Sequence, residues 1–337
     1  MTKTRRSTIE DVAEKAGVSR ATVDRVINGR GGVKRATVEK VERVIASLRY
    51  SSSSLDEIAR PRQRKIEAIV SDGTNPFFTE IRRALELQGL AGGADLVRVQ
   101  TFDPYTPTSL VACLKTVAPG TDAVIMVGAD NPAVASEIAR LTNAGTRVIT
   151  IISDVSISDM NIHIGQDSFV AGKTAARLML SALGDRTGSI AIMIGHLQFR
   201  HLLERRAGFE QSIQLSGRDL QIVHVPPYGA DPEGFANVMQ RHVLDRGDLA
   251  GVYLSGGGQP VVFDALEKLP ASIPIIAHEV TERTRAGLAS GLIDAVVAHD
   301  MSDVARAAVE VALADTPVQP GRCRIHIHVA ENLPERR

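Results

Sequence analysis

The 337-residue sequence has no tryptophan, and aromatic residues make up only 4% of it, so its cores must be built from aliphatic side chains. Its two cysteines, Cys113 and Cys323, are too few and too far apart to form a disulfide framework or a metal site. No apolar run approaches the roughly 18 residues of a membrane-spanning helix. The basic N-terminus also lacks the apolar stretch of a secretory signal. These absences predict a cytoplasmic protein with no membrane partner.

The chain has no net charge either, but its charges are unevenly distributed. Residues 1–65 contain 16 Lys and Arg against 8 Asp and Glu, and the remainder has a matching acidic excess. A basic segment attached to an acidic body indicates a head that binds a polyanion. A solvated basic tail would have the same composition, so charge alone does not separate the two interpretations.

The length favours two domains, and the first fifty residues have the apolar spacing of three short helices. Thr8 lies three residues before Asp11, as in a capping box, and Ser19 is placed to cap the second helix. Gly17 stands where a helix ends in a left-handed residue. The third helix follows a glycine-rich break at Gly29–Gly32.

Two short helices joined by a turn with glycine are typical of a helix-turn-helix, whose second helix enters the major groove of DNA. The first residues of that helix here are Arg20 and Ala21, and Arg25 lies one turn further along the same face. Arginine can bond guanine in a bidentate way, and alanine can contact a thymine methyl group. A generic three-helix bundle with surface arginines fits the same pattern, so this alternative stays open at this point.

The string TIEDVAEKAGVSRATVDRVINGRGGV, with ATVEKVERVIASLRY after it, resembles the N-terminal domain of the LacI/GalR (lactose-repressor) family. The matches are Thr-Ile-x-Asp-Val-Ala, Ala-Gly-Val-Ser, Thr-Val-x-Arg-Val-x-Asn and the closing tyrosine. The resemblance implies a homodimeric transcription regulator, most simply a repressor, that binds a pseudo-palindromic operator and responds to a small molecule. The DNA-binding residues that we expect are Thr8, Ser19, Arg20, Ala21, Thr22, Asp24, Arg25, Asn28, Arg30, Tyr50, Leu55 and Ile58.

The head departs from the family pattern at three places. Asp24 stands where the family usually has serine; it would repel a phosphate but could accept a hydrogen bond from a cytosine amino group. Lys34 replaces the serine that usually caps the third helix, at a cost of roughly 1 kcal/mol. The Ser-rich linker, residues 51–65, lacks the Tyr-x-Pro-x and Ala-x-x-Leu of the family hinge helix. Either Leu55 or Ile58 serves as the minor-groove wedge, or the hinge works less well.

From Ile66 onward, short apolar runs such as IEAIV, AVIMV and SIAIMI alternate with longer amphipathic segments. This alternation predicts an α/β body of parallel sheets covered by helices on both faces. About nine runs suit two doubly wound subdomains, and the resemblance implies a type I periplasmic-binding-protein-like fold. We therefore expect a helix-turn-helix domain over 1–50, a linker over 51–65 and a ligand-binding domain over 66–337. Its N-subdomain would span about 66–165 plus 300–320, and its C-subdomain about 166–299 plus 321–337.

Three motifs resemble parts of catalytic or metal sites but are incomplete. Gly172-Lys173-Thr174 lacks the earlier glycine of a phosphate loop and has the pattern of a helix interior. Gly256-Gly257-Gly258 lacks the third glycine of a dinucleotide fingerprint, and His326 and His328 have no third metal ligand. We therefore expect no enzyme activity, no cofactor and no metal.

Polar residues follow many of the apolar runs, where the ligands of open α/β sheets bind. Asn75-Pro76-Phe77-Phe78 would place one ring against a sugar and the other in the core, as in the family's sugar-binding relatives. The resemblance also marks an arginine before Ala-Gly-Phe, and Arg206 is a better match than Arg205. The ligand-binding candidates, of which about half should contact the ligand, are Asp72, Asn75, Phe77, Phe78, Asp130, Asp154, Asp167, Arg205, Arg206, Gly257, His278, Glu279, His299 and Asp300.

Carboxylates, an arginine fork and an aromatic platform suit a sugar, a polyol or a related hydroxylated molecule. The expected partners are therefore operator DNA, this effector and a second copy of the chain. The final residues, ENLPERR, have no heptad repeat, so we expect no helical tetramerisation tail. Two alternatives remain, a sugar-binding transport component and an α/β sugar enzyme; the first requires export and the second requires a catalytic motif.

Overall fold

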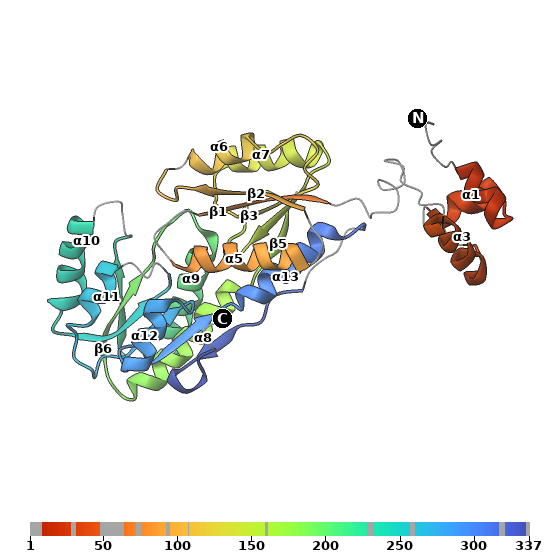
Figure 1. Ribbon diagram of the computed structural model, residues 1–337. Helices are drawn as coiled ribbons and strands as arrows, with labels where there is room; N and C mark the ends of the chain where they lie inside the picture. The colour runs from red at the N-terminus through yellow and green to blue at the C-terminus, as the bar shows by residue number, and fades with distance from the viewer. Residues whose placement is uncertain are drawn as a thin grey trace. The chain divides into compact units, whose positions relative to one another are not determined.

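The computed structural model describes residues 9–27, 32–47, 64–71, 76–91, 95–106, 108–158, 161–227, 232–256, 260–316 and 321–334. The chain divides into two compact units, a head over residues 1–63 and a body over residues 64–337 (Figure 1). In the described parts of both units, no helix combines the length and the apolar composition needed to cross a bilayer.

The head contains helices α1 (Ile9–Ala16), α2 (Arg20–Ile27) and α3 (Arg35–Ser47). They share a small core in which Val12, Val23 and Val41 have no exposed surface. Gly17 ends the first helix with a φ of +59°, a backbone conformation that glycine adopts without strain. The Oγ of Ser19 accepts a hydrogen bond from the backbone N–H of Thr22 at 3.1 Å, as an N-cap does. The predicted helix-turn-helix arrangement is confirmed.

The first sheet of the body has the strand order β2-β1-β3-β4-β5, and every neighbouring pair is parallel. Its strands are β1 (Lys65–Ser71), β2 (Asp95–Phe102), β3 (Ala123–Val127), β4 (Arg147–Ile151) and β5 (Ile162–Ile164). Its helices are α5 (Pro76–Ala91), α6 (Ser109–Lys115), α7 (Pro132–Asn143) and α13 (Met301–Leu313). Helices α6 and α7 cover one face, and α5 and α13 cover the other (Figure 1).

The second sheet has the order β11-β10-β9-β8-β6-β7, parallel except for β11. Its strands are β6 (Gly188–Met193), β7 (Leu220–Val225), β8 (Leu249–Leu254), β9 (Ile275–His278), β10 (Ala295–Ala298) and β11 (His326–His328). Its helices are α8 (Ser168–Leu183), α9 (Arg200–Leu215), α10 (Pro232–Met239), α11 (Pro260–Leu266) and α12 (Glu282–Ser290). A π-helical turn (Gln240–Leu244) extends α10, and a 3-10 turn (Ala330–Asn332) follows β11.

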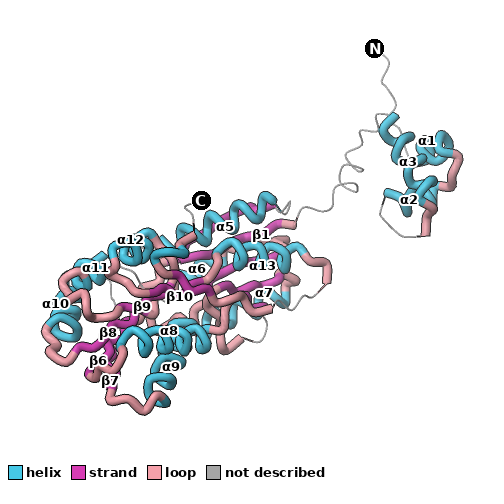
Figure 2. Tube along the Cα trace, turned by 90° about the horizontal axis from the view of Figure 1, so that it is seen from below, coloured by secondary structure: helices cyan, strands magenta, loops and turns pink. Residues whose placement is uncertain are grey.

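Helices cover both faces of this second sheet (Figure 2), and a hydrophobic core fills each face. One lies under α10, α11 and α12, and the other lies under α8 and α9. All nine apolar runs of the sequence are strands, so the predicted doubly wound α/β class is confirmed. The tenth parallel strand, β5, was not among these runs. It has only three residues and is partly exposed, so the sequence has no long apolar run there.

Helices α8 and α9 cross with their backbones in contact, because both have glycine at the crossing point. A Cβ atom on Gly172 would overlap the carbonyl oxygen of Arg205, and one on Gly208 would overlap that of Phe169. The Gly172-Lys173-Thr174 motif is therefore a helix interior, as its pattern predicted, and its glycine has a packing role. The close crossing fixes the backbone of Arg205, which matters for the site below.

Candidate functional site

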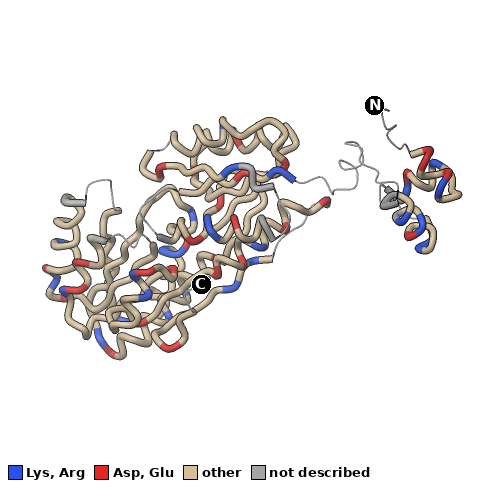
Figure 3. Tube along the Cα trace, viewed as in Figure 1, with Lys and Arg blue, Asp and Glu red and all other residues tan. Residues whose placement is uncertain are grey.

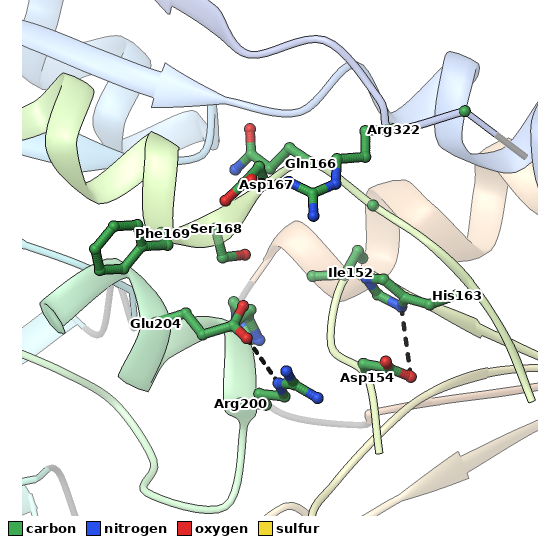
Figure 4. Close-up of a pocket in the computed structure, with 13 residues that line it drawn as sticks. Ile152, Asp154, His163, Gln166, Asp167, Ser168, Phe169, Arg200, Glu204 and Arg322 are labelled. Atoms are coloured by element: carbon green, nitrogen blue, oxygen red, sulfur yellow. Dashed lines mark hydrogen bonds and ion pairs between the residues drawn. The ribbon is translucent and has the colours of Figure 1, made fainter. Parts of the chain in front are cut away.

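A cavity of about 520 Å³ lies where the two subdomains of the body meet. Asp154 follows β4, and His163 lies in β5, on the side of the first sheet. The opposite wall is formed by the first turn of α9, with Arg200 and Glu204, and by Phe169 near the start of α8 (Figure 4). The position agrees with the general rule that ligands of open α/β sheets bind beyond the carboxyl ends of the strands.

A buried ionic cluster adjoins this cavity. Arg205, whose side chain is 1% exposed, donates from one guanidinium nitrogen to Oε1 of Glu279 and from the other to the carbonyl of Ser255 at 3.1 Å. Glu279 also accepts two hydrogen bonds from His299, one from its ring Nδ1 at 2.9 Å and one from the backbone N–H of His299 at 3.0 Å. Burial alone would raise the pKa of Glu279, but His299 and Arg205 outweigh it and hold this pKa well below its usual range.

Two further histidines surround the same carboxylate. His278, at the end of β9, shares a 2.8 Å hydrogen bond between its Nε2 and the hydroxyl of Tyr253. His201 lies one turn before Arg205 on α9 and lines the cavity. Burial, followed by the positive charge of Arg205, lowers the pKa of both imidazoles well below its ordinary value, so both are neutral at pH 7.

Several buried polar atoms in this region have no hydrogen-bond partner within the described part of the chain. They are Nε of Arg205, Nδ1 of His201, Nδ1 of His278 and both amide atoms of Gln166. Buried polar atoms are normally hydrogen-bonded, and an unmet one is costly. Gln166 and His201 line the cavity, so a hydroxylated ligand there can supply their missing partners, which indicates a binding site.

Backbone strain also marks the site. Ile152, on the cavity wall, and Glu279, in the ionic cluster, are the two described non-glycine residues with positive φ, at 65° and 66°. Such a conformation costs about 1–3 kcal/mol and persists where the surrounding structure enforces it, often at functional sites.

The two subdomains are held together beside the cavity by the segment that precedes α9. The backbone carbonyl of Gln198 accepts from the N–H of Asp130 at 2.9 Å, and its side-chain amide donates to the carbonyl of Pro104. The ring of His196 lies 4.5 Å from that of Tyr105, centroid to centroid. A ligand that alters this segment can therefore change how the two subdomains contact each other.

The structure brings six of the ligand-binding candidates to this site. Arg205, His278, Glu279 and His299 belong to the buried cluster, while Asp154 and Asp167 line the cavity. Asp167 also caps α8 through the N–H of Val170.

Four other candidates have structural contacts. Phe77 is buried in the core of the first sheet, with the partly buried Phe78 packed edge-on against it at 5.3 Å. Asp130 accepts from the backbone N–H and the hydroxyl of Ser156, and Asp300 caps α13.

The sequence favours Arg206 over Arg205 as the ligand-binding arginine, and the structure places the two side chains differently. Arg206 is 33% exposed and lies 3.5 Å from Glu210, whereas Arg205 is buried and pairs with Glu279. Neighbouring residues of a helix point about 100° apart, because one turn takes 3.6 residues. The motif match did not resolve this one-residue difference.

Sequence reasoning missed His163, Arg200, His201, Glu204 and Arg322, all of which line the cavity. A signal was present for His201, which is four residues before Arg205 and therefore lies on the same helix face. Thr8, Asn28, Arg30, Tyr50, Leu55, Ile58, Asp72, Asn75 and Gly257 lie outside the described residues.

The head presents a second candidate surface, along α2. Arg20, Ala21 and Arg25 are exposed, whereas Val23 between them is buried. Arg20 forms an exposed ion pair with Glu10 of α1 at 3.1 Å, and Asp24 is half-buried. Basic and acidic residues are interspersed along the described parts of these helices (Figure 3). The exposed face of α2 therefore has the residue types that read base edges.

Comparisons with known proteins agree with both units. The family model described as bacterial regulatory proteins, lacI family, matches residues 8–53, and the one described as periplasmic binding protein domain matches residues 66–315. The HTH-type transcriptional regulator DegA of Bacillus subtilis is 28% identical over 215 residues, or 63% of this chain and 62% of DegA. The ribose operon repressor of Escherichia coli K12 is 38% identical over 96 residues, which are 28% of this chain and 29% of the repressor.

The body also resembles solved structures, at identities that show the fold alone. A solute-binding protein of Burkholderia graminis in complex with D-arabinose has a TM-score of 0.73 at 20% identity, covering 80% of this chain and 96% of that one. A protein of Bacteroides fragilis described as a LacI transcriptional regulator has a TM-score of 0.70 at 18% identity, with coverages of 80% and 98%. The chain therefore belongs, through its body, to the periplasmic binding protein domain family, and its head matches the lacI family of bacterial regulatory proteins over residues 8–53.

Proposed function

We propose that the chain is a cytoplasmic, homodimeric repressor of transcription whose effector is a sugar, a polyol or a related hydroxylated molecule. The observation that carries the proposal is the presence of two complementary sites on one chain. The head exposes Arg20 and Arg25 on the second helix of a helix-turn-helix. The body has a cavity beside buried polar atoms that lack partners among the described residues.

The exposed residues of α2 would read base edges in the major groove, with each head of the dimer on one half-site of a pseudo-palindromic operator. Arg25 can form two hydrogen bonds to a guanine. Arg20 has to exchange its ion pair with Glu10 for a contact with DNA. Because that pair is exposed, with side chains 72% and 59% accessible, the exchange costs little.

The effector would act by favouring one arrangement of the two subdomains. A ligand can shift DNA affinity only by as much as it discriminates between the two conformations. The contacts of Gln198 with Pro104 and Asp130 join the subdomains next to the cavity, so they would change with the arrangement. The names of the ribose operon repressors, and the D-arabinose, D-allose and D-tagatopyranose complexes among the structural relatives, support a hydroxylated effector.

The proposal can be tested with fluorescence anisotropy on DNA from upstream of the chain's own gene. We expect salt-sensitive, sequence-specific binding by the full chain and loss of specific binding by Arg25→Ala. The matched control is Arg177→Ala, which removes an exposed arginine from α8 of the body and should leave binding intact. Equal losses in both variants would contradict a DNA-reading role for α2.

The two other candidates, a transport component and an α/β sugar enzyme, make different predictions in the same assay. Neither a transport component nor a sugar enzyme should bind DNA specifically. If the full chain turned over a sugar steadily and bound no DNA specifically, the proposal of a regulator would be wrong and the enzyme would be the supported candidate.

A further inference from the structure

Each arginine at the cavity is already paired with a carboxylate. Nε of Arg200 lies 2.7 Å from Oε1 of Glu204 on one side of the cavity, and Arg322 pairs with its neighbour Asp167 on the other side (Figure 4). Behind them, Arg205 pairs with Glu279. The charge of each arginine is therefore already compensated, and an anionic ligand would have to share the arginine with a carboxylate that lies next to it.

The cavity wall also carries one carboxylate without a cationic partner among its described contacts. Asp154 accepts hydrogen bonds from the hydroxyl of Thr150, the amide of Asn161 and the backbone N–H of Val155, all of which are neutral donors. His163 lies 3.8 Å away, but burial lowers the pKa of its imidazole and favours the neutral form. The described lining therefore has three carboxylates and two arginines, a net negative charge.

The unmet hydrogen-bonding atoms require both donors and acceptors from a ligand. Both amide atoms of Gln166, which lines the cavity, are unmet: its Nε2 can only donate and its Oε1 can only accept. A sugar hydroxyl can donate and accept, so it satisfies either kind of atom. A phosphate dianion or a carboxylate group can only accept, so wherever that group binds it cannot satisfy an acceptor of the site, and Asp154 repels it.

We propose that the effector is an uncharged polyhydroxy compound, and that the site discriminates against phosphate esters and sugar acids. This inference rests on the proposed function and narrows it. A sugar and its phosphate ester differ mainly in one anionic group. That group would have to bind beside arginines that are already paired with carboxylates. The discrimination therefore comes from the ion pairs rather than from the size of the cavity.

The first experiment measures binding of matched compounds to the full-length chain by isothermal titration calorimetry. The neutral set is D-ribose, D-arabinose, D-allose and glycerol, and the charged set is D-ribose 5-phosphate, D-arabinose 5-phosphate, D-allose 6-phosphate and glycerol 3-phosphate. We expect at least one neutral compound to bind at least about tenfold more tightly than its ester. An ester that binds more tightly than its parent compound overturns the inference and leaves the proposed regulator intact. If neither set binds while specific DNA binding persists, the inference and the proposed effector class both fail.

The second experiment tests the pairing itself with inorganic phosphate as the probe. Glu204→Gln leaves Arg200 in the cavity without its carboxylate, so phosphate should bind about tenfold more tightly than to the parent chain at constant ionic strength. Glu210→Gln is the matched control, because Glu210 lies on the same helix and contacts Arg206 outside the cavity. A gain in Glu204→Gln alone supports the inference. Equal gains in both variants, or a gain in neither, would contradict it.

Discussion

Replacing Glu279 by glutamine should strongly destabilise the body, because it leaves a buried guanidinium without a counter-charge. The side chain of Arg205 is 1% exposed and that of Glu279 is 9% exposed, so solvent cannot replace the lost carboxylate. Removing one partner of a buried ion pair typically costs about 3–5 kcal/mol. For a body of this size, the melting temperature should fall by on the order of 10 °C.

The same substitution should change how stability depends on pH. The folded-state pKa of Glu279 lies well below its unfolded value, so the carboxylate contributes stability that is fully present above about pH 4.5. This contribution is lost as pH falls toward the folded-state pKa. Glu279→Gln should therefore lose less stability than the parent chain between neutral pH and pH 3.

The assay is urea unfolding of the full chain, followed by far-ultraviolet circular dichroism at pH 7.5 and at pH 3. A double-mutant cycle with Arg205→Met isolates the pair, and the double variant should be less destabilised than the sum of the two single variants. A cost below about 1 kcal/mol for Glu279→Gln, or simple additivity in the cycle, would refute the claim that the two side chains form a coupled buried pair.

Two further substitutions test the positioning of the two sites. Gly208→Ala should destabilise the chain by about 2 kcal/mol or more, because a Cβ there overlaps the carbonyl of Phe169 and forces α8 and α9 apart. An unchanged midpoint of urea unfolding would show that the two helices can separate at no cost. Asp24→Ser should change which operators are bound, which a selection from a randomised operator library can measure. A uniform gain on all DNA would mean that Asp24 merely repels phosphate.

The sequence predicted the fold well because its apolar patterning is local and strong. The nine apolar runs became strands, and the head pattern became three helices around Val12, Val23 and Val41. The subdomain limits remain predictions. Each strand is recognisable without knowledge of its neighbours, so these features could be predicted from one sequence.

The candidate site was only partly predictable, because side-chain direction depends on packing between distant segments. Glu279 and His299 were recognised from their places after apolar runs, but their mutual contact requires the pairing of β9 with β10. Arg205 and Arg206 could not be separated, because the crossing of α8 and α9 decides which of them points inward. The sequence predicted that one of Phe77 and Phe78 packs in the core, and Phe77 does so; the contact of the other ring with a ligand stays a prediction.

The central claim is that a ligand in the body changes DNA binding by the head. The most direct measurement is the affinity of the full chain for its upstream DNA, by fluorescence anisotropy, with and without the neutral compound that binds in calorimetry. We predict a change of at least about fivefold in the parent chain. Arg205→Lys keeps a charge beside Glu279 but loses the guanidinium fork, so it should bind DNA normally and lose this response. An unchanged DNA affinity when the ligand saturates the parent chain would contradict the account.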